Sequence, residues 1–304
     1  MAERLPAAPG ELRRFLIENL PVRGFWIRLD EAWRNLRSHQ PYPPSVEALL
    51  GEAVSASALL AATLKFRGTL TLQLAGDGLV SLLVAQCTHD FSIRAVAHAP
   101  ESITGEPDFR ELVGNGRLSV TIEADERSAR YQGIVALEGR TLAGCLEGYF
   151  ASSEQIPTSI ALSADGQLAA GVLLQNLPPS SLAGAPATPL RDEDWQQLKA
   201  RVASLDGPLL RLGTSADVLH RVCGQFDCRL FASSPVKFMC RCDAARVQNV
   251  LRSLGLAELR SILAEQGTVT VTCEFCGRPY SFDPIDVERL FAAGVSPDTP
   301  QSLN

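Results

Sequence analysis

The stretch Thr69-Leu70-Thr71-Leu72-Gln73-Leu74 alternates polar and apolar residues, and the turn sequence Gly76-Asp77-Gly78 follows it. Alternation with a period of two is typical of a β-strand that buries one face, and Gly-Asp-Gly residues accept the backbone conformations of a tight turn. Leu79 to Cys87 supplies a second strand after the turn, so the segment is predicted to be a β-hairpin. Residues 91–98 are expected to extend the same sheet.

The sequence on both sides of this hairpin predicts one long helix and more antiparallel strands. Residues 45–66 are expected to be helical, because Ser45 can cap a helix and apolar residues then recur on one face. Further strands are expected at 117–123, 131–137, 158–163 and 167–175, with a short helix at 141–152. Few of the strands expected in this sequence alternate singly with helices, which argues against a parallel sheet. Residues 1–178 are therefore predicted to be an α+β domain of mostly antiparallel sheets with packed helices.

The middle region, residues 179–235, begins with a segment rich in proline, alanine and serine. Asp192-Glu193-Asp194 is expected to open a helix with Trp195, Leu198, Val202 and Leu205 on one stripe, and a short helix is expected at about 216–223. The middle region is too short to build a core of its own, so its apolar stripe must rest on another part of the chain. We therefore expect a metastable helical linker region.

The composition narrows the class of protein. The chain has 304 residues, and its 28 Lys and Arg against 34 Asp and Glu give a net charge of −6, which argues against a partner that is a nucleic acid. No charge-free apolar stretch of about 18 residues appears, so no membrane span is expected. Frequent charges in residues 1–20 leave no room for a signal peptide, so the protein is expected in the cytoplasm.

Cysteines crowd into one part of the chain. The chain has eight, and six of them lie within 54 residues: Cys223, Cys228, Cys240, Cys242, Cys273 and Cys276. In a reducing compartment such a group indicates metal binding or redox sensing before a disulfide scaffold. Cys87 and Cys145 stand alone and are interpreted as buried small residues.

Four of these cysteines have the spacing of a zinc site. Cys240 and Cys242 form a Cys-x-Cys pair, and Cys273 and Cys276 form a Cys-x-x-Cys pair 30 residues later, with Gly277 supplying a permissive backbone. Residues 236–304 are few enough that a metal is expected to supply much of their folding free energy. We therefore predict one Zn²⁺ per chain on these four thiolates, in a small C-terminal zinc-binding domain.

The pattern of residues leaves three functions open. A zinc site whose oxidation releases the metal could be a redox switch, but the spacing alone favours a constitutive zinc-ribbon binding protein. Residues 236–304 carry seven basic and eight acidic residues, which weakens the case for a ribbon that binds nucleic acid. A thiol oxidoreductase would use Cys273-Glu274-Phe275-Cys276 at the start of a helix. No nucleophile–base constellation is evident, so an ordinary enzyme is not expected.

The chain also resembles the heat shock protein 33 family, the redox-regulated holdase chaperones. In the C-terminal part the resemblance rests on Phe238-Met239-Cys240-Arg241-Cys242, Leu254-Gly255, Glu258-Leu259, Val271-Thr272-Cys273-Glu274-Phe275-Cys276 and Tyr280-Ser281-Phe282-Asp283. In the N-terminal part it rests on Leu50-Gly51-Glu52-Ala53, Leu64-Lys65-Phe66-Arg67-Gly68, Leu72-Gln73 with Gly76-Asp77-Gly78, and Tyr149-Phe150 through Ser153-Glu154-Gln155-Ile156-Pro157-Thr158.

The resemblance implies a mechanism. The reduced protein is an inactive monomer with zinc on Cys240, Cys242, Cys273 and Cys276. Oxidation joins Cys240 to Cys242 and Cys273 to Cys276, zinc is released, and residues 236–304 and then 179–235 unfold. The exposed apolar surface captures unfolding client proteins without ATP, and the oxidised protein is a homodimer. Cys223 and Cys228 depart from the family's four-cysteine pattern; they are interpreted as semi-buried residues or, as an open alternative, as accessory thiols.

Overall fold

The computed structural model describes residues 10–124, 130–178 and 190–292, and the chain divides into two units, Met1–Met239 and Cys240–Asn304. In the first unit the strands are β1 (Gly10–Ile17), β2 (Val22–Leu29), β3 (Gly68–Gly76), β4 (Leu82–Thr88), β5 (Ser92–His98), β6 (Gly116–Ala124), β7 (Arg130–Ala136), β8 (Thr158–Ala164), β9 (Ala169–Asn176) and β10 (Cys228–Phe238). Its helices are α1 (Glu31–Arg37), α2 (Pro44–Thr63), α3 (Phe109–Val113), α4 (Leu142–Tyr149), the π-helix η1 (Phe150–Glu154), α5 (Asp192–Ala203), α6 (Gly207–Leu212) and α7 (Ser215–Cys223).

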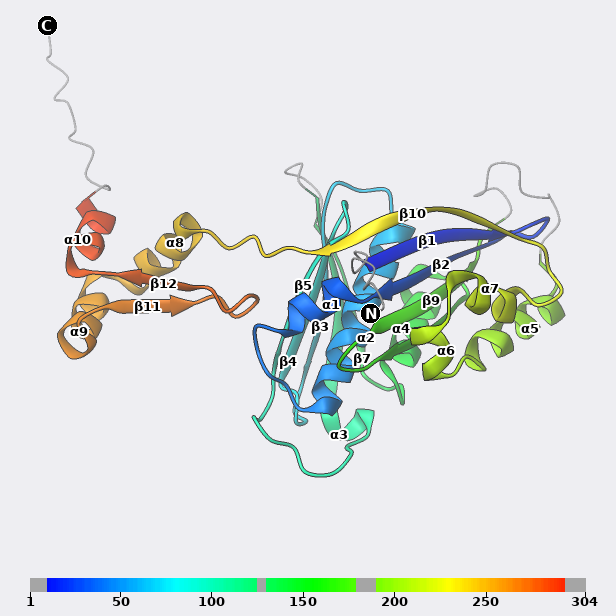
Figure 1. The fold of residues 1–304 in the computed structure, drawn as a ribbon, viewed down its shortest axis with the longest axis horizontal. Helices are drawn as coiled ribbons and strands as arrows, with labels where there is room; N and C mark the ends of the chain where they lie inside the picture. The colour runs from blue at the N-terminus through cyan, green and yellow to red at the C-terminus, as the bar shows by residue number, and fades with distance from the viewer. Residues whose placement is uncertain (1–9, 125–129, 179–189, 293–304) are drawn as a thin grey trace, which may run out of the picture. The chain divides into compact units, whose positions relative to one another are not determined.

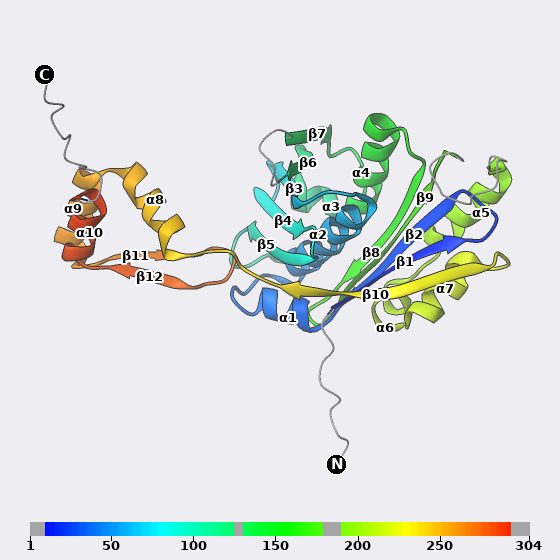
Figure 2. The same ribbon diagram turned by 90° about the horizontal axis from the view of Figure 1, so that it is seen from above.

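The strands of the first unit form one sheet in the order β7-β6-β3-β4-β5-β10-β1-β2-β9-β8. Neighbouring strands are antiparallel except β10 and β5, which are parallel over the pairs Lys237–Ser92 and Phe238–Ile93. The sheet curls around α2, as Figure 2 shows. This arrangement confirms the predicted fold class. The β3–β4 hairpin is the one that Gly76-Asp77-Gly78 indicates, and β8 and β9 form a second hairpin from the strands expected at 158–163 and 167–175.

Helix α2 is the central helix of the first unit. It is buried along almost its whole length from Val46 to Ala61, and it packs against strands β2, β4, β5, β8 and β9. By length and composition α2 could cross a membrane, which the sequence expectation did not foresee, but 72% of its apolar window is buried within the protein. Burial of this extent is that of a core helix.

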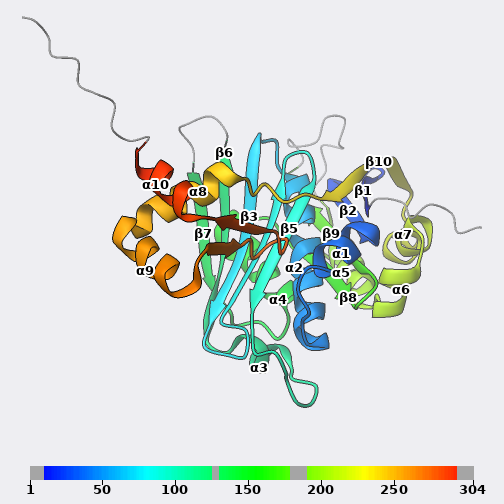
Figure 3. The same ribbon diagram turned by 60° about the vertical axis from the view of Figure 1, so that its left-hand side comes forward.

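Alternating residues of β2 serve two different cores. Phe25, Ile27 and Leu29 face the core around α2, whereas Trp26 and Val22 face α5, α6 and α7. The second core, which we call the helical cluster, joins Trp195, Leu198, Val202, Val218 and Val222 to residues of β1, β2 and β9. Figures 1 and 3 show α5–α7 gathered over the part of the sheet that contains these strands. The predicted stripe of α5 therefore rests on the sheet.

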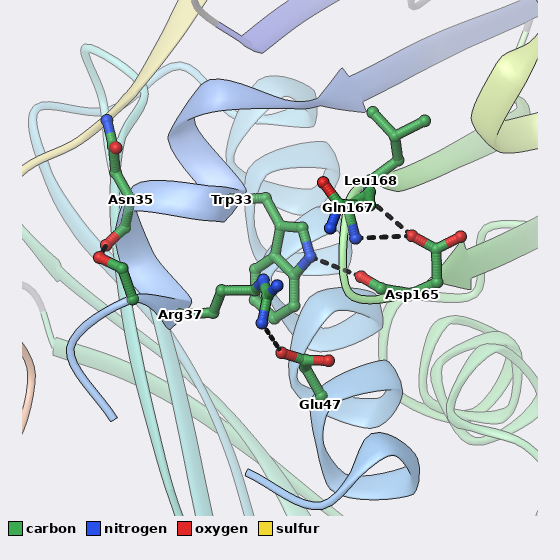
Figure 4. A network of polar contacts seen from close by, with 8 residues as sticks. Trp33, Asn35, Arg37, Glu47, Asp165, Gln167 and Leu168 are labelled. Atoms are coloured by element: carbon green, nitrogen blue, oxygen red, sulfur yellow. Dashed lines mark hydrogen bonds and ion pairs between the residues drawn. The ribbon is translucent and has the colours of Figure 1, made fainter. Parts of the chain in front are cut away.

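A polar network fixes α1 beside the β8–β9 turn (Figure 4). The indole nitrogen of Trp33 donates to the carbonyl of Asp165 at 2.7 Å, and the Asp165 carboxylate accepts from the backbone of Gln167 and Leu168 at 2.8 and 2.9 Å. Arg37 forms an ion pair with Glu47 at the start of α2. These contacts hold the first turn of α2 and the β8–β9 hairpin around one buried tryptophan.

The second unit is small. It contains α8 (Ala244–Leu254), α9 (Leu256–Gln266), the antiparallel hairpin β11 (Val269–Thr272) and β12 (Pro279–Phe282), and α10 (Pro284–Ala292). Its core consists of six buried residues among those described: Leu251, Leu259, Val269, Phe282, Val287 and Leu290. Figure 1 shows helices α9 and α10 at the end of this hairpin. A core of this size leaves room for a metal to contribute to folding.

Candidate metal centre

Four cysteine side chains converge at one end of the β11–β12 hairpin. Cys240 and Cys242 lie in the segment between β10 and α8, Cys273 follows β11 directly, and Cys276 lies in the turn before β12. Their sulfur atoms all lie within 4.8 Å of one another, and each side chain is half-buried. We call this group the four-thiol cluster; the structure thus brings together the four residues predicted as metal ligands.

The backbone of the hairpin turn presents two of these thiols to the same point. The amides of Cys276 and Gly277 both donate to the carbonyl of Cys273, at 3.3 and 2.8 Å, and the amide of Cys273 donates to the carbonyl of Arg278 at 2.9 Å. Gly277 has φ +64°, a left-handed conformation that glycine adopts at little cost. The expectation that Gly277 supplies a permissive backbone is confirmed.

The spacing of the sulfur atoms suits a tetrahedral ion. Thiolates about 2.3 Å from a tetrahedral Zn²⁺ stand about 3.8 Å from one another. The measured contacts are close to that value, since Cys240 Sγ lies 3.6 Å from Cys273 Sγ and Cys242 Sγ lies 3.4 Å from Cys276 Sγ. All four cysteines are free thiols. The donor set and its geometry therefore fit a metal ion that prefers four soft ligands.

Electrostatics favour a cation at the centre of the cluster. Burial raises the pKa of Cys242, but hydrogen bonds from Tyr280 and the neighbouring thiols outweigh it and bring the pKa to about 7. Burial and hydrogen bonding with the other thiols raise the pKa of Cys276 to about 12, and burial also raises the pKa of Cys273. One thiol ionises readily and its neighbours then retain their protons, because adjacent negative charges repel. A divalent cation removes this repulsion.

Tyr280 is a functional residue to which the sequence reasoning assigned no role. It lies on β12 opposite Val271, and its hydroxyl donates to Cys242 Sγ at 3.1 Å. Arg278 interacts electrostatically with Tyr280, Cys242 and Cys276. Such partners orient a ligand and hold charge next to it. The signal in the sequence was a tyrosine shortly after a Cys-x-x-Cys-Gly turn, at a position that a hairpin returns to the four-thiol cluster.

The remaining cysteines lie in the first unit. Cys87 and Cys145 are 0% and 4% exposed, as the interpretation of buried small residues expects. Cys223 is buried at the end of α7, Cys228 is half-buried at the start of β10, and both side chains pack in the helical cluster. Among the described residues, the four-thiol cluster is the one group of three or more His, Cys, Asp or Glu side chains placed to hold a metal.

The setting of Cys273 and Cys276 argues against the oxidoreductase alternative. That function requires the pair at the start of a helix beside a βαβ core, where the helix dipole lowers a thiol pKa. Instead the pair lies in the turn of an antiparallel hairpin, and its thiols contact two further cysteines. The arrangement is that of a metal knuckle.

Comparisons with known proteins agree with this geometry. A family model described as "Hsp33 protein" matches residues 10–283. A 33 kDa chaperonin of Shewanella woodyi is 40% identical over 290 residues, covering 95% of this chain and 98% of its own. One of Pseudomonas aeruginosa is 41% identical over 286 residues, covering 93% and 95%. The crystal structure of the 33 kDa chaperonin, a heat shock protein 33 homologue, from Thermotoga maritima shares the fold, with TM-score 0.79, 23% identity and coverage of 94% and 98%.

Proposed function

The chain belongs to the Hsp33 family of chaperones, and on that premise we propose that it is a redox-regulated, ATP-independent holdase whose switch is the four-thiol cluster. The observation that carries the proposal is the convergence of Cys240, Cys242, Cys273 and Cys276 in a unit with a small core. In this proposal residues 1–178 form the client-binding core, residues 179–235 the metastable linker, and residues 236–304 the redox switch.

The cluster is proposed to hold one Zn²⁺ in the reduced protein. When bound, the ion supplies roughly 10–16 kcal/mol of folding free energy, which is as large as the stability of a whole small domain. The four cysteines hold it as thiolates, and Tyr280 donates a hydrogen bond that orients Cys242. Because the second unit would owe this much of its stability to zinc, it would unfold when oxidation of the cysteines removes the zinc ligands.

Oxidation is proposed to remove the ligands. Each pair of thiols gives two electrons to a peroxide, which is reduced to two waters, and a disulfide forms between the two sulfur atoms. The family pairing is Cys240 with Cys242 and Cys273 with Cys276, whereas the short sulfur contacts at 3.4 and 3.6 Å join residues across these pairs. The bonds therefore require the turn and the segment before α8 to move, which couples oxidation to unfolding.

Strand β10 is proposed to carry this change to the middle region. Only Met239 separates Cys240 from the end of β10, and hydrogen bonds at this end join Lys237 to Phe91 and Met239 to Ile93. The first part of β10 pairs with β1, which is itself part of the floor of the helical cluster. Loss of the folded second unit frees the end of β10 and so weakens the support of α5–α7.

Release of α5–α7 is proposed to create the surface that binds clients. Trp195, Leu198 and Val202 on the helices, and Phe15 and Trp26 on the sheet, are at most 9% exposed in the folded protein. Separating the two layers exposes a contiguous apolar face, which is the kind of surface that binds unfolding proteins. We further propose that the oxidised protein is a homodimer and that the protein works in the reducing cytoplasm, where oxidation is a stress signal.

The experiment measures zinc and chaperone activity on the same sample. Purified protein is treated with hydrogen peroxide at mildly raised temperature; released zinc is read with a chromogenic chelator and protection with an aggregating client. We expect about one zinc per chain to leave and protection to appear, both reversed by dithiothreitol and zinc. A Cys145→Ser variant, which alters a buried thiol outside the cluster, serves as the matched control. Zinc release without protection would establish the constitutive zinc-ribbon alternative instead.

A further inference from the structure

Two cysteines outside the four-thiol cluster meet across a tight turn. Cys223 is the last residue of α7, and Cys228 is the first residue of β10. Gly224, with φ +58°, ends the helix, and the amide of Phe226 donates to the carbonyl of Cys223 at 3.0 Å, which reverses the chain. The amide of Glu18 fixes the far side of the turn by donating to the Asp227 carbonyl at 2.9 Å. The turn therefore brings the end of α7 and the start of β10, and with them the two cysteines, next to each other.

The thiols differ in their access to solvent. Cys223 is 3% exposed and belongs to the helical cluster, whereas Cys228 is half-buried and packs against the same cluster. Both side chains belong to the same cluster, and the two thiols interact with each other electrostatically. One accessible thiol in contact with one protected thiol is the arrangement of an attacking and a resolving cysteine.

A positive charge stands next to the pair. A Cβ atom on Gly224 would lie only 2.3 Å from Cζ of Arg201, so the guanidinium of Arg201, on α5, lies against the backbone of the turn. Arg201 also interacts electrostatically with Cys223. The guanidinium favours the thiolate of Cys223, the form in which Cys223 displaces the hydroxyl of a sulfenic acid on Cys228, whereas Glu18 interacts electrostatically with Cys228 and opposes its ionisation.

We infer that Cys223 and Cys228 form a second redox pair, independent of zinc, that a peroxide oxidises to a disulfide. The Cys228 thiolate attacks one peroxide oxygen, which gives a sulfenic acid and releases water after protonation. The Cys223 thiol then displaces the second water and forms the S–S bond, so two thiols and one peroxide become one disulfide and two waters. The pKa of Cys228 is lowered by its interaction with the Cys223 thiol, which agrees with the role of attacking thiol.

The disulfide would act on the middle region. It ties the last turn of α7 to the strand that pairs with β1, so this end of the helical cluster stays anchored when the rest is released. Closing a short loop also limits the conformations of the unfolded segment. This consequence rests on the proposed function, whereas formation of the disulfide does not.

Mass spectrometry of the full-length protein tests the pair separately from the zinc site. Trypsin cuts after Arg221 and Arg229, so residues 222–229 hold Cys223 and Cys228 and no other cysteine, while a cut after Arg241 separates Cys240 from Cys242. The protein is treated with peroxide, its thiols are alkylated, and it is digested without reductant. We expect peptide 222–229 to lose two hydrogens and to take up no alkylating group, and to recover both sites after dithiothreitol.

Substitutions near the pair test which residues promote formation of the disulfide and what the disulfide does to α7. Arg201→Gln should slow disulfide formation in peptide 222–229 several-fold, whereas Lys199→Gln, an exposed cation on the same helix, should not change it. In oxidised protein, amides of α7 should exchange with deuterium on the order of tenfold faster in Cys228→Ser than in wild type. Full alkylation of peptide 222–229 after peroxide, in protein that has lost its zinc, would falsify the pair and leave the proposed function standing.

Discussion

At the residue scale, Tyr280 is the hydrogen-bond partner of one thiol of the four-thiol cluster. Its hydroxyl donates to Cys242 Sγ at 3.1 Å from the facing strand of the hairpin. We expect Tyr280→Phe to weaken zinc binding by about 10-fold, because partners of metal ligands contribute on that scale. Competition with a chelator measures the affinity, and Tyr131→Phe, a tyrosine of the first unit, is the matched control. Equal zinc affinity in Tyr280→Phe and wild type would contradict this role.

Glu52 on α2 predicts how stability depends on pH. Burial raises its pKa from 4.5 to about 7, so the folded protein keeps the proton that the unfolded chain releases above pH 4.5. Stability from this group is therefore complete below pH 4.5 and is lost as the pH rises towards 7. We expect Glu52→Gln to be more stable than wild type at pH 8, by about 2 to 3 kcal/mol, and equally stable at pH 4.

Urea unfolding followed by tryptophan fluorescence measures this difference. All three tryptophans, Trp26, Trp33 and Trp195, lie in the first unit, so the signal reports on the unit that contains Glu52. Glu101→Gln, which changes an exposed carboxylate, controls for net charge. A gain at pH 8 that persists unchanged at pH 4 would mean that the effect comes from packing and not from titration.

At the scale of elements, Leu198 tests whether the helical cluster restrains the chaperone. Its side chain is fully buried between α5 and the sheet. Leu198→Ala removes about 2–5 kcal/mol of stability at such a site. We expect α5–α7 to be cleaved faster by protease in the reduced protein, and client protection to appear at lower peroxide. Leu212→Ala, at a position 72% exposed on α6, should change neither. If α5–α7 are cleaved faster but client protection still needs as much peroxide as in wild type, the helical cluster does not restrain chaperone activity.

The sequence predicted the elements that have one buried face. The hairpin around Gly76-Asp77-Gly78 shows a clean period of two, and α2 and α5 carry recognisable stripes, so each was found. Strand β2 was missed because both of its faces are buried, so Val22 to Leu29 shows no alternation. Strand β10 was missed for the opposite reason, since it is largely half-buried or exposed and contains Pro235. Both strands depend on contacts far along the chain.

The four ligands of the candidate site were predictable because thiol spacing is local information. The sequence placed Cys240, Cys242, Cys273 and Cys276 in one site, and the structure brings their sulfurs together. The role of Tyr280 depends on the register of β11 against β12, which composition does not reveal. The contact between Cys223 and Cys228 depends likewise on the turn that Gly224 opens. These contacts depend on the pairing of distant segments, which the spacing of residues in the sequence does not reveal.

At the scale of the whole molecule, the two units should differ in their need for metal. Cys273→Ser removes one ligand, and we expect the second unit to lose ordered structure in reductant while the sheet of the first unit persists. The middle region should be cleaved faster by protease, since the end of β10 loses its folded neighbour. Hydrogen exchange resolved by peptide measures all three regions at once, with Cys145→Ser as control. Unchanged protease resistance of residues 190–235 would count against the coupling.

The place of β10 in the strand order has a further consequence. It joins β1 on one side and, through only Lys237 and Phe238, β5 on the other, so it is the seam between two half-sheets. Removal of β10 from the sheet would leave unpaired backbone amides and carbonyls along the edges of β1 and β5. Exposed strand edges pair with an extended chain through main-chain hydrogen bonds, and this pairing depends little on the sequence of that chain. In the proposed holdase, a sheet opened at β10 would therefore bind unfolding chains of many different sequences through their backbones.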